Sequence, residues 1–520
     1  MTNCTTFLDV NRRLGDKPAL IFPAENITYS YGELFEAVCR RSNFYLKKGI
    51  RKGDRLCIYL PANPEYLLSY LALWRIGAVA VPLNIVLSDS EVGYMLRNSG
   101  SEAIITDRSG EKNAKSACAG FRDEGEGRVP MIFTTGDAEF EAEVAKMPEY
   151  IRAVNVESDC LCQLQYTSGT TGQQKGAMLT HGNWMAAFDA ESSLMKYTYD
   201  DVYLGIYPMA HVGVSWGISA LKAGSTWVIM EKFDMDRYIE YADKYKVTVI
   251  AGMPPVIHSL VKMPAGTEDK FRTCREMISG GGPLHPSVWK EFHYRYGIPI
   301  INAYGLSETI VVGTGTAIRQ EDYRTADEFK SVGAPVGFTE MKIVNTEDPS
   351  IELDTGGVGE VALRGPAIAR GYWMMPVESA KVFLPDGWFL TGDIGFIDGN
   401  GMLSITDRKK DMIVMSGWKV YPTEVEKAYI EHPDIDDIAI FGCPDIHRGE
   451  IPVAAVVFKK GKVLTDEELI EYGMTKLARY KVPRNYIRVD ELPRVNGWKL
   501  LRRELREKYC STFAGRQENQ

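Results

Sequence analysis

Residues 28–107 alternate between stretches with the apolar spacing of a helix and short apolar runs typical of buried strands. The helical stretches occupy residues 34–46 and 65–76, and the strand-like runs occupy residues 56–60, 78–81 and 103–106. A chain that alternates in this way folds with right-handed crossover connections, which place successive strands side by side and parallel. The pattern therefore predicts a largely parallel sheet covered by helices, which is an α/β fold.

The next regions differ in texture. The alternation resumes with a strand at residues 226–230, a helix at 236–245 and a strand at 247–250. Residues 108–156 are polar and charged, so we interpret them as a variable surface region. From about residue 340, short apolar runs separated by glycine and aspartate turns favour a small antiparallel subdomain. These runs occupy residues 342–344, 359–363, 388–390 and 402–405.

Residues 410–520 mix strand and helix patterns of their own. The expected elements are strands at residues 414–420, 438–441 and 453–458, helices at 423–430 and 466–479, and a frayed tail at 511–520. A chain of 520 residues exceeds what one core usually supports, so we predict two domains. Residues 1–409 form a large N-terminal domain of parallel-rich sheets and helices plus the small antiparallel subdomain. Residues 410–520 form a small, mobile α+β domain.

Composition and charge exclude several classes of protein. Apolar residues make up 45% and charged residues 25% of the chain, as in an average globular protein. The net charge of −9 argues against a nucleic-acid partner. The longest apolar stretch, residues 66–74, is too short to form a transmembrane segment. Because the N-terminus lacks the charged-then-apolar pattern of a signal peptide, we expect a cytoplasmic location.

Nine cysteines are spread from Cys4 to Cys510 without a framework pattern. An odd number distributed in this way is typical of reduced intracellular thiols. Cys160 and Cys162 would share one face of a strand, but no other paired ligands lie nearby in the sequence. No metal site is therefore expected at these two cysteines.

Residues 166–176, with the sequence YTSGTTGQQKG, combine small hydroxyl side chains with glycines and a lysine. Glycines let backbone N–H groups approach a ligand closely, and the hydroxyls and the Lys175 ammonium supply further donors. The segment is not a Walker A loop, because Gln174 precedes Lys175 and Gly176 follows it. On composition alone, the segment is either a flexible surface connection or a polyphosphate-binding loop. The loop would bind through Thr167, Ser168, Gly169, Thr170, Thr171 and Gly172.

Seven further motifs follow this loop along the chain. They are PMAHVG (208–213), SGGGPL (279–284), NAYGLSET (302–309), TGD (391–393), DRKKD (407–411), SGWKVYPTEVE (416–426) and LPRVNGWKLLRRELR (492–506). With the loop, this ordered set resembles the adenylate-forming superfamily, which includes acyl-CoA synthetases, firefly-type luciferases and the adenylation domains of nonribosomal peptide synthetases. The resemblance covers about residues 15–506.

The resemblance implies a nucleotide site. Tyr304 would stack on adenine, opposite a ledge at Gly281 and Gly282 where no side chain intrudes. Asp393 and Arg408 would hold the ribose hydroxyls. The remaining residues assigned to ATP and AMP are Asn302, Ala303, Gly305 and Ser307. Outside the family, Tyr304 would be a core aromatic residue, and Asp393 and Arg408 would be turn and surface residues.

The resemblance also assigns residues to the chemistry. Lys499 would bridge the substrate carboxylate and the α-phosphate of ATP, which offsets the repulsion between two anions. Lys175 would act at the phosphates, and His211 would lie beside the acyl carboxylate. Glu308 and Thr167 would offer oxygen ligands to Mg²⁺. Outside the family, Lys499 would be a solvated lysine and His211 a polar residue at a helix start.

Two reaction steps are implied by the resemblance. A small carboxylate attacks the α-phosphorus of ATP and pyrophosphate leaves; the thiol of coenzyme A (CoA) then takes the acyl group and AMP leaves. Between the steps, the C-terminal domain would rotate about a hinge at Lys410. This rotation would bring Ser416, Gly417 and Trp418 to the pantetheine of CoA. The expected ligands are therefore ATP, Mg²⁺, CoA and a carboxylic acid, and the choice between monomer and homodimer stays open.

The acyl pocket would draw on Met209, Val212, Gly213 and Trp216. Trp216 would shorten this pocket and favour aromatic, alicyclic or short-to-medium acids over long fatty chains.

Three positions depart from the pattern of the family. Gln174 replaces a proline, Ser307 replaces a threonine, and Trp498 stands where glycine usually precedes the catalytic lysine. Losing the proline frees one backbone dihedral, which lowers the stability of the folded chain by on the order of 1 kcal/mol. Tryptophan does not readily adopt the positive φ that glycine permits, so either Gly497 absorbs the bend or Trp498 packs on the nucleotide.

Three alternative functions stay open at this level. Residues 213–217, GVSWG, fit the G-x-S-x-G elbow of serine hydrolases, but the residues before Ser215 do not read as the strand that this motif needs. A regulator would bind nucleotide without catalysis if Trp498 displaced Lys499. A variant of the same chemistry would deliver the acyl group to a carrier protein or to oxygen.

Overall fold

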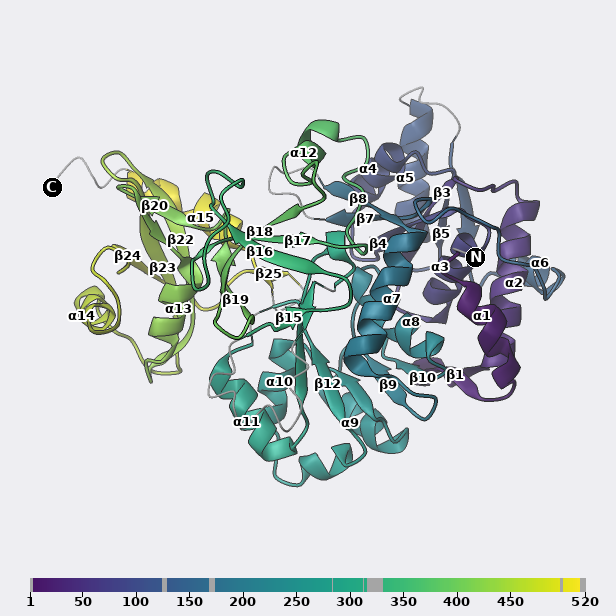
Figure 1. The fold of residues 1–520 in the computed structure, drawn as a ribbon, viewed down its shortest axis with the longest axis horizontal. Helices are drawn as coiled ribbons and strands as arrows, with labels where there is room; N and C mark the ends of the chain where they lie inside the picture. The colour runs from purple at the N-terminus through teal and green to yellow at the C-terminus, as the bar shows by residue number, and fades with distance from the viewer. Residues whose placement is uncertain are drawn as a thin grey trace. The chain divides into compact units, whose positions relative to one another are not determined.

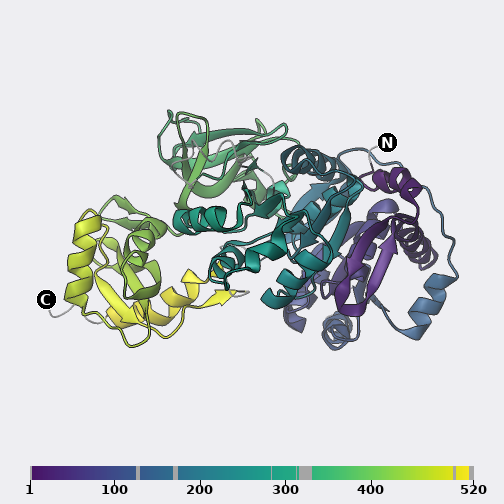
Figure 2. The same ribbon diagram turned by 90° about the horizontal axis from the view of Figure 1, so that it is seen from below.

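The computed structural model describes residues 3–123, 129–167, 174–282, 284–311, 313–315, 331–495 and 499–514. The chain divides into two compact units, Met1–Met341 with Leu363–Leu390, and Lys342–Ala362 with Thr391–Gln520. The N-terminus belongs to the first unit and the C-terminus to the second (Figures 1 and 2). The expected α/β fold with parallel-rich and antiparallel sheets is confirmed. The two units are defined by the contacts within each of them. The predicted boundary at residue 410 is instead a hinge about which residues 410–520 would rotate, so it stays a prediction.

The first unit contains a sheet of nine described strands in the order β15-β14-β13-β12-β11-β9-β10-β1-β2. The strands from β13 to β1 are parallel, and β2, β14 and β15 pair antiparallel at the two edges. Their bounds are β1 (Pro18–Phe22), β2 (Ile27–Ser30), β9 (Val202–Gly205), β10 (Thr226–Ile229), β11 (Val249–Ala251), β12 (Glu276–Ser279), β13 (Ile300–Tyr304), β14 (Thr314–Gly315) and β15 (Ala334–Pro335). The strands predicted at residues 226–230 and 247–250 are confirmed as β10 and β11.

A second sheet in this unit has six described strands in the order β6-β5-β3-β4-β7-β8. Their bounds are β3 (Arg55–Leu60), β4 (Val79–Asn84), β5 (Ala103–Thr106), β6 (Met131–Thr134), β7 (Leu161–Thr167) and β8 (Lys175–Thr180). The three strands predicted within residues 28–107 are confirmed as β3, β4 and β5. The interpretation of residues 108–156 as a surface region is wrong, because β6 pairs with β5 and Phe133 packs in the core against Phe44.

Helices connect and cover these strands (Figure 1). They are α1 (Thr6–Asn11), α2 (Tyr31–Lys47), α3 (Pro64–Arg75), α4 (Asp89–Ser99), α5 (Glu111–Asp123), α6 (Ala138–Ala145), α7 (His181–Met195), α8 (Ser215–Lys222), α9 (Met235–Lys244), α10 (Pro254–Val261), α11 (Pro286–Tyr296) and α12 (Pro376–Ala380), with the 3-10 helices η1 (Arg12–Leu14), η2 (Pro23–Glu25), η3 (Val212–Val214), η4 (Thr267–Phe271) and η5 (Ser307–Thr309). The start of α2 is set by a capping box, in which the N–H of Glu33 donates to the Ser30 hydroxyl and the N–H of Ser30 donates to the Glu33 carboxylate.

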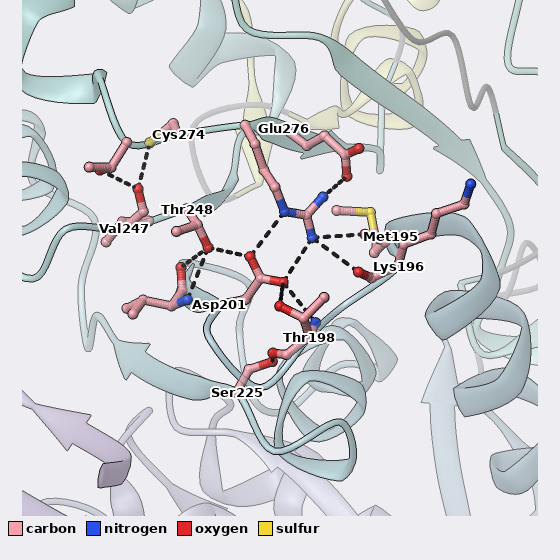
Figure 3. Close-up of polar contacts among 12 residues, drawn as sticks. Met195, Lys196, Thr198, Asp201, Ser225, Val247, Thr248, Cys274 and Glu276 are labelled. Carbon is pink, nitrogen blue, oxygen red and sulfur yellow. Dashed lines mark hydrogen bonds and ion pairs between the residues drawn. The ribbon is translucent and has the colours of Figure 1, made fainter. Parts of the chain in front are cut away.

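A buried carboxylate ties together the starts of three strands in the nine-stranded sheet (Figure 3). Asp201, just before β9, accepts hydrogen bonds from the Thr248 hydroxyl at 2.6 Å and from Nε of Arg275 at 3.0 Å. Thr248 precedes β11 and Arg275 precedes β12, so one side chain links three parallel strands at their N-terminal ends. The opposite, C-terminal ends are where parallel sheets usually bind ligands.

The antiparallel subdomain has four strands in the order β16-β17-β18-β19, as the glycine-separated runs predicted. Their bounds are β16 (Glu340–Val344), β17 (Gly359–Arg364), β18 (Phe389–Ile397) and β19 (Leu403–Arg408). β18 and β19 pair antiparallel and place Asp393 opposite Arg408. Most of this sheet belongs to the second unit.

The rest of the second unit is an α+β fold. Its elements are β20 (Ile413–Met415), β21 (Trp418–Val420), α13 (Pro422–Ile430), β22 (Ile435–Asp445), β23 (Gly449–Phe458), α14 (Asp466–Lys476), β24 (Asn485–Arg488), β25 (Arg494–Val495), β26 (Lys499–Leu500) and α15 (Arg502–Ala514). Residues 414–420 are not one strand as predicted, because Ser416 and Gly417, with φ of +50° and +82°, turn the chain between β20 and β21. The predicted tail at 511–520 is wrong at its start, since α15 continues through Ala514.

Two cysteines of this unit are not free thiols, contrary to the expectation for all nine. Cys443 on β22 and Cys510 on α15, whose Cα atoms lie 5.2 Å apart, form a disulfide. The seven other cysteines are free. Across the described part of the chain, none of the helices combines the length and the apolar character needed to cross a membrane.

Candidate active site

The predicted phosphate loop joins β7 to its antiparallel neighbour β8, which is the edge strand of the six-stranded sheet. β7 ends at Thr167 and β8 begins at Lys175, and these two residues lie opposite each other in the ladder. The predicted residues between them, Ser168, Gly169, Thr170, Thr171 and Gly172, lie outside the described residues. The structure therefore gives the two ends of the loop, with a hydroxyl on one and an ammonium on the other.

A chain of polar contacts leads from Lys175 to Glu308. Nζ of Lys175 lies 3.2 Å from Oε2 of Glu378 on α12 and 5.1 Å from the ring centre of Tyr372. The Tyr372 hydroxyl donates to Oε1 of Glu308 at 2.8 Å. Burial, reinforced by the Glu308 carboxylate, raises the pKa of Tyr372, which keeps this hydroxyl a neutral donor. The structure thus brings the predicted lysine and the predicted metal-binding carboxylate into one network within the first unit.

Neither Tyr372 nor Glu378 was predicted from the sequence. Both lie more than 60 positions from Glu308 or Lys175 along the chain and belong to none of the eight motifs. The one local feature near Tyr372 is the GYW triplet at residues 371–373. An aromatic pair after a glycine does not by itself indicate a functional site.

The predicted adenine site lies at the C-terminal ends of two neighbouring parallel strands. Ser279 of β12 is in register with Asn302 of β13, so the glycines that follow β12 leave the sheet at the same end at which β13 reaches Tyr304. Gly281 and Gly282 are exposed, and Gly281 has a φ of +82°, which a side chain would disfavour. Ala303 and Asn302 are buried, and Gly305 and Ser307 follow directly, with Ser307 opening η5.

Two buried side chains hold the loop that carries His211 through hydrogen bonds to its backbone. The Tyr70 hydroxyl donates to the Met209 carbonyl at 3.1 Å, and the Gln165 amide donates to the Ala210 carbonyl at 3.0 Å. His211 is exposed and is the N-cap of η3, as its predicted place before a helix implied. Tyr70 and Gln165 were also missed, because each looks like an ordinary core residue of α3 or β7.

The residues predicted to line the acyl pocket are buried near the start of α8: Met209, Val212, Gly213 and Trp216. Neighbouring aromatic rings fill the space beside two glycines here. A Cβ atom on Gly213 would lie 3.0 Å from the Cβ of Tyr207, and one on Gly217 would lie 2.3 Å from the ring of Trp227. The large side chains that occupy the space around the start of α8 are therefore those of Tyr207, Trp216 and Trp227.

The serine hydrolase alternative fails at Ser215. The residues before it form η3 rather than a strand, and Ser215 itself begins α8 with a fully buried side chain. Its hydroxyl donates to Glu191 on α7, as does the Ser219 hydroxyl. Burial raises the pKa of Glu191 to about 8, so this carboxyl is protonated at neutral pH and cannot serve as the charged partner of a base.

In the second unit, the structure pairs the two residues predicted to hold ribose. Nε of Arg408 lies 3.0 Å from Oδ1 of Asp393, whose side chain is almost fully buried while that of Arg408 is half exposed. The next residue, Lys409, forms an ion pair of 2.6 Å with the buried Glu360 of β17. Lys410 follows in the exposed turn between β19 and β20. The predicted hinge thus lies two residues beyond the end of β19 and directly after the anchored Lys409.

The predicted catalytic lysine, Lys499, is the first residue of β26, which pairs with β25 as a short hairpin. Gly497 and Trp498 lie outside the described residues. Directly after the hairpin, the Arg502 guanidinium binds both carboxylate oxygens of Glu426 at 2.8 and 2.7 Å and the Ile440 carbonyl at 3.1 Å. This partly buried contact fixes the base of the hairpin on α13 and β22, and the sequence did not predict it.

Of the residues predicted to meet CoA, Ser416 and Gly417 form the β20–β21 turn and Trp418 begins β21. Trp418 is 59% exposed, and its ring packs at a tilt of 30° against that of Tyr480, with ring centres 5.0 Å apart. A Cβ atom on Gly417 would meet no described atom within 4 Å. The turn is therefore an exposed, uncrowded element next to an aromatic pair.

Comparisons with known proteins agree with this arrangement. The family model described as AMP-binding enzyme matches residues 7–373, and that of the AMP-binding enzyme C-terminal domain matches residues 424–497. The chain is 32% identical to 4-coumarate–CoA ligase 2 of Petroselinum crispum, over 96% of this chain and 92% of that protein. It is 30% identical to a feruloyl-CoA synthase of Amycolatopsis sp, over 92% and 94%, and 32% identical to a long-chain-fatty-acid–CoA ligase of Bacillus subtilis, over 96% and 93%. The crystal structure of ATP-bound MatB from Rhodopseudomonas palustris superposes with a TM-score of 0.90 at 28% identity, covering 98% of this chain and 99% of that one.

Proposed function

This chain belongs to the family of AMP-binding enzymes and is an AMP-forming acid–CoA ligase; we propose that its acid is compact, either aromatic or short to medium in length. In the first step the carboxylate displaces pyrophosphate from ATP and forms an acyl-adenylate. In the second, the CoA thiol displaces AMP and forms the thioester. The observation that carries the choice of acid is the filling of the space around the start of α8 by Tyr207, Trp216 and Trp227.

We assign the nucleotide contacts as follows. Tyr304 and the glycines after β12 take the adenine, since a flat ring and a bare backbone suit a planar base. The buried carboxylate of Asp393, held in place by Arg408, accepts the ribose hydroxyls. Thr167, Lys175 and the intervening loop hold the phosphates, and the ammonium of Lys499 draws the carboxylate and the α-phosphate together.

Mg²⁺ fits the donors of this chain. Glu308 offers a carboxylate and Thr167 a hydroxyl, which are the hard oxygen ligands that this ion prefers. The hydroxyl of Tyr372 fixes the orientation of the Glu308 carboxylate. A bound Mg²⁺ ion supplies positive charge that neutralises the phosphates. The role of Tyr372 is therefore to position the carboxylate for that purpose.

For the second step, we propose that residues 410–520 rotate about Lys410 and present the β20–β21 turn to CoA. An exposed turn residue directly beyond the anchored Lys409 can change its backbone angles without breaking a described strand pair. Gly417, with open space around it, leaves room for pantetheine. The proposal includes a cytoplasmic location, and a light-scattering measurement decides between monomer and homodimer.

Steady-state release of AMP tests the proposal with 4-coumarate, ferulate, benzoate, hexanoate and palmitate as acids. We expect palmitate to show a kcat/KM at least about tenfold below the best compact acid, the scale on which a pocket discriminates by size. Trp216→Ala should raise the relative kcat/KM for palmitate, whereas Trp289→Phe, a change in the buried face of α11, serves as the matched control. Palmitate as the best substrate of the unaltered enzyme would contradict the assignment of a compact acid while leaving the ligase reaction intact.

A further inference from the structure

Cys4, Cys162 and His181 meet in the interior of the first unit. All three are buried, and their ligand atoms, one from each residue, lie within 4.8 Å of one another. Among the described residues this is the one group of three His, Cys, Asp or Glu side chains that is so placed. The expectation that Cys162 has no further ligands nearby is therefore wrong, because its neighbours come from distant parts of the sequence.

The separations match those between ligands of one zinc ion. With Zn–S bonds of about 2.3 Å and Zn–N bonds of about 2.0 Å, tetrahedral ligands lie about 3.8 Å apart for two sulfurs and about 3.6 Å apart for sulfur and nitrogen. Sγ of Cys4 and Nδ1 of His181 are 3.2 Å apart, and no pair in the group exceeds 4.8 Å. Movements below about 1 Å would bring all three ligands to a common centre.

Charge and polarity also favour a cation at this place. Two thiolates neutralise a divalent ion, so a Cys-Cys-His site carries no net charge and avoids the cost of burying one. Nε2 of His181 is buried and has no hydrogen-bond partner among the described residues, whereas Nδ1 accepts from the Cys4 N–H at 3.3 Å, a bond that a metal on Nδ1 would replace. Sγ of Cys162 lies 3.6 Å from the Leu179 carbonyl and is hydrogen-bonded with the Cys4 thiol. Thiolate and imidazole ligands select zinc over magnesium or calcium. The Leu179 carbonyl or a water molecule would complete four-coordination.

The three ligands are held by separate, rigid elements. Cys4 follows Asn3, whose side-chain amide donates to the Trp74 and Val154 carbonyls at 2.9 and 3.1 Å. Cys162 is part of β7, and His181 is the first residue of α7, directly after the capping residue Thr180. Such preorganisation is what a metal site requires of its scaffold.

We propose that Cys4, Cys162 and His181 bind one Zn²⁺ ion, which fastens the N-terminal segment to β7 and α7. Binding converts the two thiols to thiolates and releases two protons. Thr167 lies five positions beyond Cys162 in β7, which is about 16 Å at the usual rise per residue. The ion is therefore structural and takes no part in the chemistry at the phosphate loop.

Metal analysis of the purified full-length chain tests the proposal. After equilibration with Zn²⁺ and removal of loosely held metal, we expect one zinc per chain, and loss of most of it in Cys162→Ser and in His181→Gln. Cys57→Ser removes another buried cysteine of the same sheet and should keep the full content. Circular dichroism shows whether each variant is folded.

A second measurement uses only the unaltered chain and so does not depend on the folding of variants. Replacing zinc by Co²⁺ should give the near-ultraviolet absorption of a thiolate–cobalt bond, and a strong chelator should lower the melting temperature. An unaltered chain that binds no zinc and shows no such absorption would overturn the proposal. A disulfide between Cys4 and Cys162 in peptide maps of the non-reduced protein would overturn it as well.

Discussion

Glu191 gives the folded chain a pH dependence that a single substitution should remove. This residue of α7 is fully buried, and the Ser215 and Ser219 hydroxyls of α8 are its hydrogen-bond partners. Burial raises the pKa of its carboxyl from the ordinary 4.5 to about 8. Glu191→Gln keeps the size of the side chain and its capacity to bond both serines, but it cannot ionise.

The sign follows from comparing the folded and unfolded chains. In the unfolded chain the carboxyl of Glu191 ionises above about pH 4.5, whereas in the folded chain it keeps its proton up to about pH 8. Between these values only the unfolded state gains from ionisation, so the free energy of unfolding falls as the pH rises. At about 1.4 kcal/mol for each pH unit, the loss across the whole window is on the order of 5 kcal/mol. Below pH 4.5 the carboxyl has no effect of this kind, because both states are protonated.

Urea unfolding of both chains, followed by tryptophan fluorescence between about pH 5 and about pH 8, measures this effect. Both chains share all other titratable groups, so subtracting one free energy of unfolding from the other removes the contribution of those groups. We expect Glu191→Gln to gain stability over the unaltered chain steadily as the pH rises. Asp189→Asn removes a carboxylate from the exposed side of the same helix and serves as the control. A difference that stays constant with pH, or that favours the unaltered chain at high pH, would refute the reasoning.

Three other substitutions test separate parts of the enzyme. Lys499→Ala should slow adenylate formation by about 10²-fold or more while supplied acyl-adenylate is still converted to thioester; equal losses in both half-reactions would contradict its role at the phosphate. Gly417→Leu should stop thioester formation but spare ATP–pyrophosphate exchange, with Gly417→Asn as the control that tolerates positive φ; unchanged CoA turnover in the leucine variant would argue against the pantetheine contact. Glu426→Ala should destabilise the second unit by about 1.5–3 kcal/mol, because it removes the two charge-assisted hydrogen bonds of the partly buried Arg502 guanidinium. Adding Arg502→Met should recover part of that loss, and an additive loss in the double variant would show that the pair does not act as a unit.

The parallel core was predictable because its strands carry their own local signal. β3, β4 and β5 are almost continuously apolar, as strands covered on both faces must be, and α3 is buried along its whole length. The region around β6 was misread because its apolar run ends after Phe133 and lies within a stretch that is otherwise polar and charged. The turn at Ser416 and Gly417 was missed because apolar residues continue on both sides of it and one glycine is a weak turn signal.

The same contrast applies to the site. Side chains that meet a ligand directly stand in short motifs, because a loop or a strand end must present several groups to one molecule. Their supports do not: Tyr372 reaches Glu308 across 64 positions, and Gln165 reaches Ala210 across 45. A support acts through a contact that exists only in the folded chain, so no local spacing reveals it. The cysteine–histidine group is the extreme case, in which 177 positions separate two of the three members.

This difference has a consequence for how specificity evolves in such a fold. The acyl pocket that we propose is lined from the start of α8, and the shape of that segment depends on residues behind it: the ring of Trp227 against Gly217, and the carboxyl of Glu191 against Ser215. A change in either support shifts the segment without altering a residue that the substrate would touch. Under this proposal, relatives with similar motifs would act on different acids, because the motifs would fix the chemistry at the phosphate while the packing behind α8 would decide which acyl group fits beside it.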